Sequence, residues 1–297
     1  MAKTTEFKIT KKRKAVWNAE MKLAKELIRV CKKNNLKIFI DSGTLLGAVR
    51  HGGFIPWDDD IDFVMMREDY DKLQEIAKKE FEKPFHFQTP YTDKGYYHPH
   101  AQLRLDGTTA ILEDNGDAFD FHQGIFVDIF PIDYISINPK TNKKIIRKLK
   151  TLGILMRASV DPRKRGNFVK NAAVSALRIF HFDSVKLFKK YEKIIRNIPK
   201  KSYKLAKVSL YADVNEYRKA LPESYFEKMI EMKFENTTLP GPANADDILT
   251  LFYGKDYMTP KQVSSDHKGV LFSTTEDYKK VLKKLRSGNI KKEDYWL

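Results

Sequence analysis

The sequence predicts an α/β (α+β) fold in which a mixed sheet is flanked by helices and carries a basic helical insert. Segments with an apolar repeat of helical period alternate with short apolar segments that are typical of strands. The chain has 297 residues, 42% of them hydrophobic, so it is long enough to form a core of one or two domains. Its formal net charge of +16 is concentrated in one block, which indicates a separate element.

The apolar periodicity assigns the individual elements in order. Residues at helical spacing predict two long helices, at 15–34 and 68–81. Ser42 and Gly43 are suited to begin a shorter helix over 44–50. Short apolar segments predict strands at 37–41, 60–66, 85–88, 100–105, 109–112 and 124–130, and the last of these should end at Pro131. Nearer the carboxyl terminus, 236–244 has the composition of a loop and 245–253 that of a short helix.

The excess charge lies between Lys140 and Lys204. This block contains 20 Lys and Arg residues and only three acidic ones, while the rest of the chain is nearly neutral. Its pattern predicts two or three helices, interrupted near Asp161–Pro162 and at Gly166. We therefore expect a catalytic domain made of 1–139 and 205–297, with 140–204 as a basic helical insert.

Two interpretations of the insert remain open. Apolar residues at helical spacing predict an amphipathic helix over 183–200 whose apolar side packs on the rest of the protein, and the lysines would then face solvent. The alternative is that 140–204 binds an anionic membrane surface. Nucleic acid is not expected as a partner, because the block has no recognition motif and few aromatic residues placed for stacking.

The composition also excludes several classes of protein. There is no apolar segment close to the roughly 20 residues that a membrane-spanning helix needs. The basic amino terminus is not followed by the apolar segment of a signal peptide. Cys31 is the single cysteine, which excludes an internal disulfide and Cys-rich zinc sites. We expect a cytoplasmic protein, which could also lie peripherally on the inner face of the cytoplasmic membrane.

An acidic sequence, Trp57-Asp-Asp-Asp-Ile-Asp62, is the first candidate for chemistry. In a strand, Asp60 and Asp62 project from one face while Ile61 enters the core. The 124–130 strand carries Asp128 among apolar residues, where a carboxylate is costly unless it is paired or metal-bound. Carboxylates gathered in this way resist joint ionisation, and a hard divalent cation such as Mg²⁺ or Mn²⁺ relieves the repulsion.

The acidic run has two other interpretations. A solvated acidic turn is the simpler alternative. An EF-hand calcium loop is excluded, because Phe63 occupies the position that requires Gly and Asp69 the position that normally holds Glu.

The turn at Asp41-Ser-Gly-Thr44 is a second candidate part of the site, beside the carboxylates. Backbone N–H groups of Gly43 and Thr44, at the start of a helix, are suited to hold a phosphate group. The turn is neither a P-loop nor a dinucleotide-binding fingerprint, because the required Lys and Gly spacings are absent. Asp60 follows Gly43 by 17 residues, which makes the combination more informative than either part.

The segment from Ser42 to Asp62 resembles the first motif of the LicD family, in the nucleotidyltransferase (polymerase beta-like) superfamily. Ile125-Phe-Val-Asp-Ile-Phe-Pro-Ile-Asp133 is similar to the second motif of the family. Tyr253-Gly-Lys-Asp-Tyr257, with His267, is similar to its carboxyl-terminal motif. The family is named for the phosphocholine transferase of bacterial surface glycans and includes fukutin-related proteins.

The resemblance implies a nucleotidyltransferase-like sheet and transfer of phosphocholine, or a related alditol phosphate, from a CDP-activated donor such as CDP-choline. The acceptor would be a hydroxyl of a teichoic acid, lipopolysaccharide or capsule precursor, which can be lipid-linked. One or two Mg²⁺ (or Mn²⁺) ions would be held by Asp60, Asp62 and Asp128, and Asp128 could also accept the proton of the attacking hydroxyl. Transfer of NMP from NTP to RNA or protein, and a non-catalytic basic adaptor, are the alternatives.

Further residues are assigned to substrate binding. Ser42, Gly43 and Thr44 would hold a phosphate, and Arg50 could neutralise developing charge, with a helix-end salt bridge as the equal alternative. Asp58 and Asp59 belong to the first motif, and Arg104 is a possible phosphate contact; His267 is assigned by resemblance alone. The sequence His98-Pro-His100 is too isolated to indicate a metal site, and a position in a loop or at a strand edge is the favoured interpretation. Trp57, Tyr96 and Tyr97 could enclose choline, although aromatic residues more often pack in cores.

Overall fold

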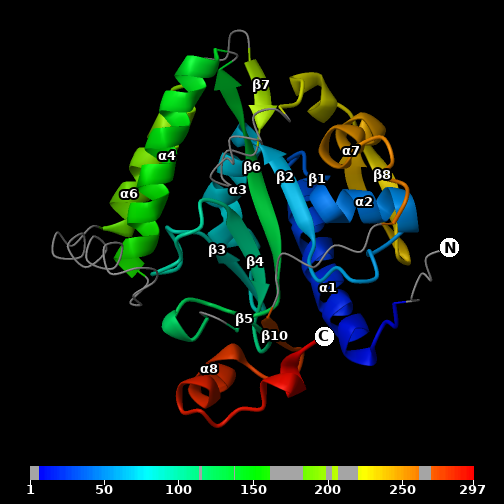
Figure 1. Ribbon diagram of the computed structural model, residues 1–297, viewed down its shortest axis with the longest axis vertical. Helices are drawn as coiled ribbons and strands as arrows, with labels where there is room; N and C mark the ends of the chain where they lie inside the picture. Colours follow the sequence, from blue (N-terminus) through cyan, green and yellow to red (C-terminus); the bar gives the residue numbers. More distant parts are fainter. Residues whose placement is uncertain are drawn as a thin grey trace.

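The centre of the molecule is a mixed sheet with the strand order β1-β2-β6-β4-β3 (Figure 1). The computed structural model describes residues 7–113, 116–136, 138–160, 183–198, 203–206, 220–260 and 269–297. The strands of this sheet are β1 (Phe39–Ile40), β2 (Asp62–Met66), β3 (Phe85–Gln88), β4 (Ala101–Leu105) and β6 (Phe126–Ser136), with β7 (Tyr203–Ala206) paired to the far end of β6.

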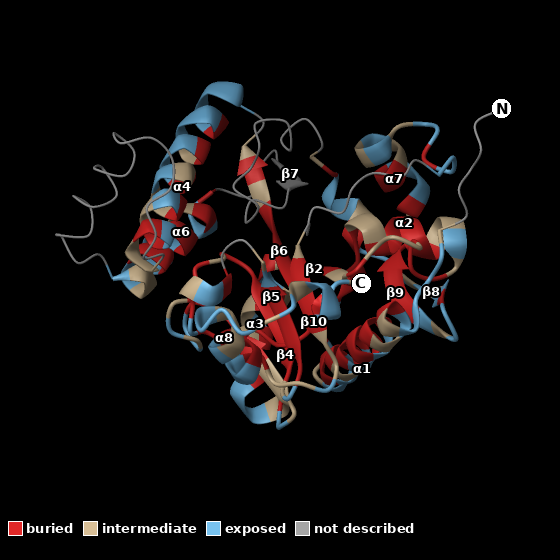
Figure 2. Ribbon diagram, turned by 60° about the horizontal axis from the view of Figure 1, so that its bottom comes forward, coloured by how far each residue is buried: buried red, intermediate tan, exposed pale blue. Residues whose placement is uncertain are grey.

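The pairing of β2 with β6 is parallel, and the other pairs of this sheet are antiparallel. In the parallel pair Asp62 lies opposite Asp128. Most sheet residues are buried between helices, as Figure 2 shows. The predicted mixed sheet flanked by helices is therefore confirmed.

The helices form where apolar residues recur at helical spacing. The helix α1 (Lys11–Lys33) is capped by Thr10, whose side chain accepts a hydrogen bond from the Arg13 N–H. Four residues of its predicted apolar stripe are fully buried: Val16, Leu23, Leu27 and Val30. The other helices on the main core are α2 (Ser42–His51), α3 (Arg67–Glu80) and α7 (Ala245–Tyr253). Two small antiparallel sheets lie outside the central sheet: β5 (Thr109–Leu112) with β10 (Val270–Ser273), and β8 (Met229–Phe234) with β9 (Thr237–Pro242). The described residues also include the helix α8 (Tyr278–Arg286) and 3₁₀ turns at Gly116–Ala118, Glu223–Phe226 and Lys292–Tyr295.

Two basic helices, α4 (Pro139–Val160) and α6 (Ser184–Arg196), pack side by side (Figure 1). Their apolar residues form a second core cluster with aromatic residues of the loops around 96 and 120. The predicted stripe on α6 is buried in that cluster, including Phe188, Tyr191 and Ile195. The expected interruptions at Asp161–Pro162 and Gly166 lie outside the described residues.

A buried ionic network joins α6 to the central sheet. Arg67, at the start of α3, donates two hydrogen bonds of 2.6 Å to the carboxylate of Asp133 on β6. The same guanidinium lies 3.6 Å from Glu192 on α6, and Arg196 pairs with both Glu192 and Asp71. The basic helices are therefore fixed to the sheet by charge as well as by apolar packing.

The prediction that the β6 strand ends at Pro131 was wrong. The strand continues to Ser136 because Pro131 lies between the residues that pair with β4 and those that pair with β7. No backbone N–H donor is needed there on that edge of β6. Pairing with β4 ends at Ile129, and pairing with β7 begins at Asp133. A proline is tolerated in a strand where its missing N–H has no partner strand.

The prediction of a loop over 236–244 was also wrong, because Thr237–Pro242 forms β9. Pro240 and Pro242 are two residues apart, so their missing N–H groups lie on the same edge of the strand. Among the described strands β9 pairs with β8 alone, which leaves its other edge without ladder hydrogen bonds. None of the helices in the described ranges combines the length and hydropathy that crossing a membrane requires.

Candidate active site

The structure brings Asp60, Asp62 and Asp128 together at the start of the parallel strand pair. One oxygen of each carboxylate lies within 4.8 Å of the others. Asp62 is the first residue of β2, and Asp128 faces it from β6. Asp60 lies in the loop just before β2 rather than inside the strand, so it reaches the cluster from the loop and not by strand alternation.

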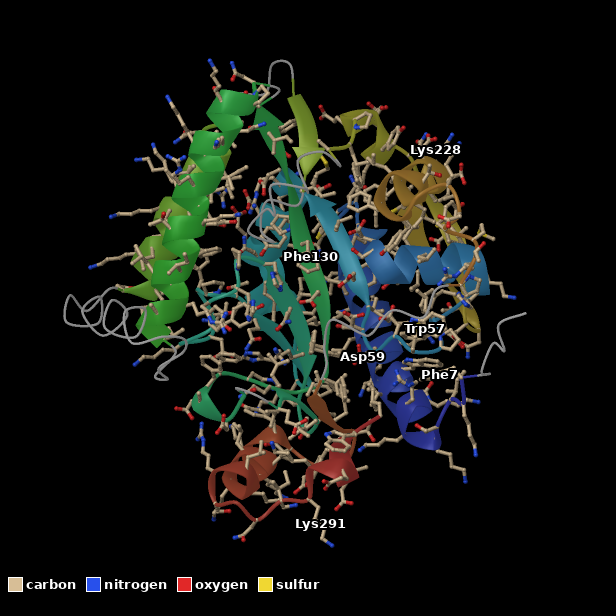
Figure 3. The ribbon with its side chains drawn as sticks, in the orientation of Figure 1. Phe7, Trp57, Asp59, Phe130, Lys228 and Lys291 are labelled. Carbon is tan, nitrogen blue, oxygen red and sulfur yellow. The ribbon has the colours of Figure 1, made fainter. Side chains whose placement is uncertain are left out.

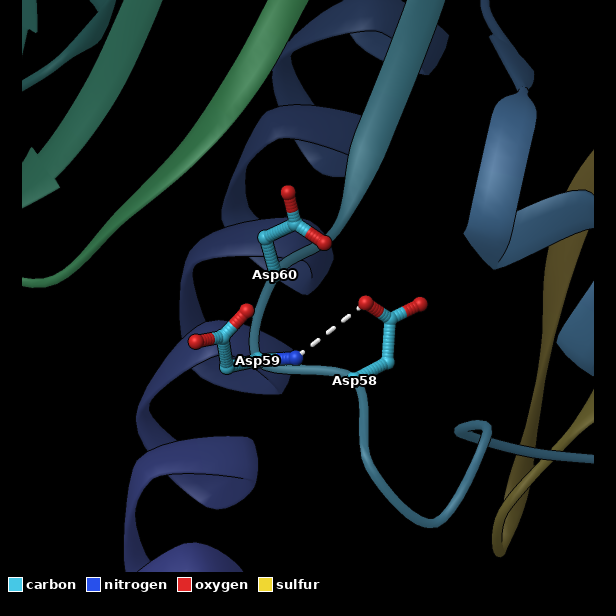
Figure 4. A group of neighbouring side chains, drawn as sticks. All are labelled: Asp58, Asp59 and Asp60. Atoms are coloured by element: carbon cyan, nitrogen blue, oxygen red, sulfur yellow. Dashed lines mark hydrogen bonds between the residues drawn. The ribbon is translucent and has the colours of Figure 1, made fainter. Parts of the chain in front are cut away.

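The loop before β2 is held by α1. The backbone carbonyl of Asp58 accepts hydrogen bonds from Arg13 (2.7 Å) and from the indole N–H of Trp17 (3.1 Å). Asp58, Asp59 and Asp60 form a second group of neighbouring carboxylates that shares Asp60 with the first (Figure 4). The Asp59 N–H lies 3.3 Å from the Asp58 carboxylate, and the Asp59 side chain is buried. The acidic run is therefore a fixed loop with defined contacts.

Glu20 on α1 is a further carboxylate beside this run, and no sequence motif indicated it. Its side chain is 1% exposed, and one of its oxygens has no hydrogen-bond partner. Burial, followed by the charges of Asp60 and Asp59, raises its pKa well above the usual range. The signal in the sequence was an acidic residue on the apolar stripe of α1, between Val16 and Leu23.

The amino terminus of α2 lies against the acidic loop. The helix begins at Ser42, after Asp41, two residues earlier than predicted. A Cβ atom at Gly43 would lie 2.5 Å from the Asp58 carboxylate, so glycine is required for this approach. The Thr44 hydroxyl accepts a 2.9 Å hydrogen bond from the Asp62 N–H. The predicted phosphate-binding turn and the carboxylates are thus in direct contact.

Asp128 is held by two side chains that precede it in the chain. The Gln102 side-chain amide donates a 2.7 Å hydrogen bond to Asp128, and His100 Nε2 lies 3.1 Å from the same oxygen. Gln102 is on β4 opposite Asp128, and His100 directly precedes that strand. His100 was predicted to be an isolated loop or strand-edge residue. Its position beside the strand was right, but its contact with Asp128 depends on the strand order, which the sequence alone did not show.

The aromatic candidates lie in different surroundings. Tyr96 and Tyr97 are buried in the second core cluster, so they are packing residues and not an exposed cage. Trp57 is partly exposed and packs edge-on against Phe7, with ring centroids 6.2 Å apart (Figure 3). Burial and the neighbouring His100 lower the pKa of His98 to about 3, so that imidazole is neutral at pH 7.

Tyr253, from the carboxyl-terminal motif, also borders the cluster. Partial burial and the carboxylates of Asp41 and Asp62 raise the pKa of its phenol. Tyr253 ends α7 and retains 42% exposure, so its ring lies at the open side of the site.

Two predicted substrate contacts are placed elsewhere. Arg50 lies at the last turn of α2, about 10 Å along the helix axis from Gly43, and donates to the Tyr257 carbonyl at 2.9 Å. Arg104 is buried, and its guanidinium donates to protein oxygens of Gln88, Gln102 and Gly124. The placement of Arg104 does not support a phosphate contact, because burial and these three acceptors occupy it. His267 lies outside the described residues.

The donor set fits a hard divalent cation. Asp60, Asp62 and Asp128 offer only carboxylate oxygens, which Mg²⁺ and Mn²⁺ prefer over nitrogen or sulfur ligands. Their closeness is costly without a compensating charge, because the carboxylates repel one another.

The structure has a mixed sheet and a carboxylate cluster beside a helix amino terminus, which is the arrangement that the LicD resemblance implied. Residues 35–170 match the model of the LicD/FKTN/FKRP nucleotidyltransferase domain. The chain is 27% identical over 232 residues to the lipopolysaccharide cholinephosphotransferase LicD of Haemophilus influenzae, covering 77% of this chain and 84% of that protein. The predicted resemblance to the LicD family is therefore confirmed, with the domain match over residues 35–170 and the relative over 77% of this chain.

Two further relatives are similar over short segments. An uncharacterized protein of Rickettsia prowazekii is 56% identical over 54 residues, which is 18% of this chain and 20% of that protein. An uncharacterized protein of Rickettsia typhi is 45% identical over 75 residues, which is 25% of this chain and 23% of that protein.

Proposed function

We propose that this protein is a Mg²⁺-dependent transferase that moves phosphocholine, or a related alditol phosphate, from a CDP-activated donor to a hydroxyl group of a cell-surface glycan. CDP-choline is the preferred donor, and the acceptor is a precursor of lipopolysaccharide, teichoic acid or capsule. The observation that carries the proposal is the cluster of Asp60, Asp62 and Asp128 beside the amino terminus of α2. Similarity to the Haemophilus cholinephosphotransferase supports the choice of transferred group.

Each part of the cluster has a role in this chemistry. Phosphoryl transfer requires positioning and charge neutralisation more than covalent catalysis. A divalent cation held by Asp60, Asp62 and Asp128 would offset the negative charge of a diphosphate. The N–H groups at Gly43 and Thr44 would orient a phosphate oxygen. Asp128, positioned by Gln102 and His100, would accept the proton that the attacking hydroxyl loses.

The test is nucleotide release with a panel of donors. Purified protein is mixed with Mg²⁺, a candidate glycan acceptor and either CDP-choline, CDP-ribitol or each NTP. The proposal expects CMP release from CDP-choline or from the CDP-alditol. Pyrophosphate release from an NTP would instead support NMP transfer. Failure of every nucleotide to react, with salt-sensitive binding retained, would support the non-catalytic adaptor.

Matched variants test the residues. Asp62→Asn should reduce turnover by about a thousandfold or more, because it removes one anionic ligand and keeps the side-chain shape. Glu75→Gln, an equivalent change at an exposed position of α3, should leave turnover unchanged. Normal turnover by Asp62→Asn, with its fold checked by circular dichroism, would exclude the proposed role of the cluster.

A further inference from the structure

A groove on the surface of the two basic helices contains none of the residues to which the catalytic proposal gives a role. It lies between α4 and α6 and has a volume of about 580 Å³. Four of its lining side chains are cationic: Arg147, Lys148, Lys190 and Lys193. The other lining side chains are Leu152, Ile194, Thr151 and Asn197. The groove therefore combines aliphatic surface with a positively charged border.

The surroundings of the groove carry charge of one sign. The two helices together contain twelve Lys and Arg residues and one acidic residue, Glu192. Glu192 is 5% exposed and is paired with Arg67 and Arg196, so it faces the protein interior. Figure 3 shows nitrogen-tipped side chains projecting outward from both helices. An anionic partner would meet no exposed carboxylate on these two helices.

An exposed aliphatic side chain extends the apolar part of this surface. Ile154 on α4 is 63% exposed. It follows Arg147 by seven residues and Thr151 by three, which places all three on the same stripe of the helix. Among the described residues that line the groove, none is aromatic, so none offers a ring on which a base could stack. Aliphatic groups beside cations are suited to a partner that has both acyl chains and phosphate groups.

We propose that the α4–α6 groove binds the surface of a membrane that contains anionic phospholipids. Lipid phosphate groups would contact Arg147, Lys148, Lys190 and Lys193, while Leu152, Ile154 and Ile194 would contact the acyl chains close to the headgroups. This partner goes beyond the transferase proposal and does not depend on which group is transferred. It fits a transferase whose acceptor is anchored in lipid.

The experiment measures binding of the full chain to vesicles without a donor or an acceptor. Wild-type protein is centrifuged with vesicles of phosphatidylcholine alone or with 30% phosphatidylglycerol, at low and at high NaCl. The proposal expects binding to the anionic vesicles only, and weaker binding at high salt. Lys190→Glu/Lys193→Glu should weaken the apparent binding constant by about tenfold or more, because each lysine near an anionic surface contributes to affinity.

A matched control separates this groove from net charge. Lys280→Glu/Lys283→Glu makes the same change in charge at exposed positions of α8, with the same spacing of three residues. The control should bind vesicles as the wild type does. The proposal fails if the wild type does not bind anionic vesicles, if both double variants lose binding equally, or if neither does. Binding to single-stranded RNA but not to vesicles would likewise overturn it.

The catalytic proposal is tested separately in the same variants. Lys190→Glu/Lys193→Glu should release CMP at the wild-type rate with a water-soluble acceptor, because neither lysine belongs to the carboxylate cluster. Vesicle binding can thus fail while turnover is kept, and turnover can fail while vesicle binding is kept.

Discussion

Gly43 lies where the amino terminus of α2 meets the loop that carries Asp58. Its hydrogen atom faces the Asp58 carboxylate, where any larger side chain would make contact. In the proposed reaction, this short distance would allow the helix N–H groups and the acidic loop to act on one phosphate group. The residue therefore matters for the position of Asp58 more than for the stability of the helix.

Gly43→Ala should lower turnover by about tenfold or more, because the new methyl group displaces the Asp58 side chain from the site. The free energy of unfolding should change by less than about 1 kcal/mol, since alanine favours helix formation. Steady-state kinetics and urea unfolding measure the two effects. Wild-type turnover in a correctly folded variant would show that the position of Asp58 is unimportant.

The surroundings of His122 predict a stability that depends on pH. Its Nδ1 accepts the Gly124 N–H at 3.1 Å and its Nε2 lies 2.9 Å from Asp106, so the native ring is neutral with the proton on Nε2. Burial, then the charges of Arg104 and His86, lowers its pKa to about 4. The unfolded chain, with an ordinary pKa near 6.5, binds the proton first on acidification.

The free energy of unfolding should therefore be highest above about pH 6.5 and fall as the pH approaches 4. The contribution of His122 should be about 1–2 kcal/mol between pH 6.5 and 5. Urea unfolding of the wild type and of His122→Gln at pH 7.5, 6.5 and 5 measures it. The variant should show a smaller loss on acidification, and an equal loss would assign the pH dependence to other groups.

At the scale of elements, the attachment of α6 to the sheet depends on one buried arginine. Arg67→Met would leave the Asp133 carboxylate buried without its partner, which should cost about 3–5 kcal/mol of unfolding free energy. Arg196→Met changes a more exposed member of the same network and should cost about 1 kcal/mol or less. Chemical denaturation of both variants measures the difference, and equal losses would contradict the importance of the buried pair.

Most elements of the core could be predicted from local pattern, and the departures have a common cause. The ranges of β3, β5 and α7 match their predictions, because the periodicity and turn signals are local. Pro131 and the prolines of β9 suggested breaks, yet each occupies a position where the neighbouring strand needs no N–H donor. Only the strand order reveals such positions.

The same limit applies to the site. Asp60, Asp62 and Asp128 could be selected because their motifs are continuous in the chain. Gln102 and His100 could not, since their contact with Asp128 requires β4 to lie beside β6. Arg104 was named as a possible phosphate contact, but its side chain is buried. A charged residue in a short predicted strand did not indicate that burial.

At the scale of the whole molecule, a cation in the carboxylate cluster should stabilise the folded state. A ligand at one hundred times its dissociation constant adds about 2.7 kcal/mol when it binds only the native protein. Mg²⁺ or Mn²⁺ should therefore raise the melting temperature by several degrees, and EDTA should reverse the change. Differential scanning fluorimetry measures this, with NaCl of equal ionic strength as the control.

The effect should disappear in Asp62→Asn and in Asp128→Asn, which each lack one ligand. If neither metal changes the melting temperature of the wild type, a cation site is excluded. If both variants respond as the wild type does, the cation binds elsewhere.

The length of β6 has a consequence for the geometry of the proposed reaction. Asp128 lies near one end of the strand, and Asp133, which holds Arg67 and through it α6, follows five residues later, about 17 Å away along the strand. An extended strand in a sheet does not change length, so the separation between the carboxylate cluster and the point where the basic helices attach is constant. If those helices rest on a lipid surface, the height above that surface at which an acceptor hydroxyl can react is set by the sheet, and acceptors would be selected by how far their hydroxyl extends from the lipid.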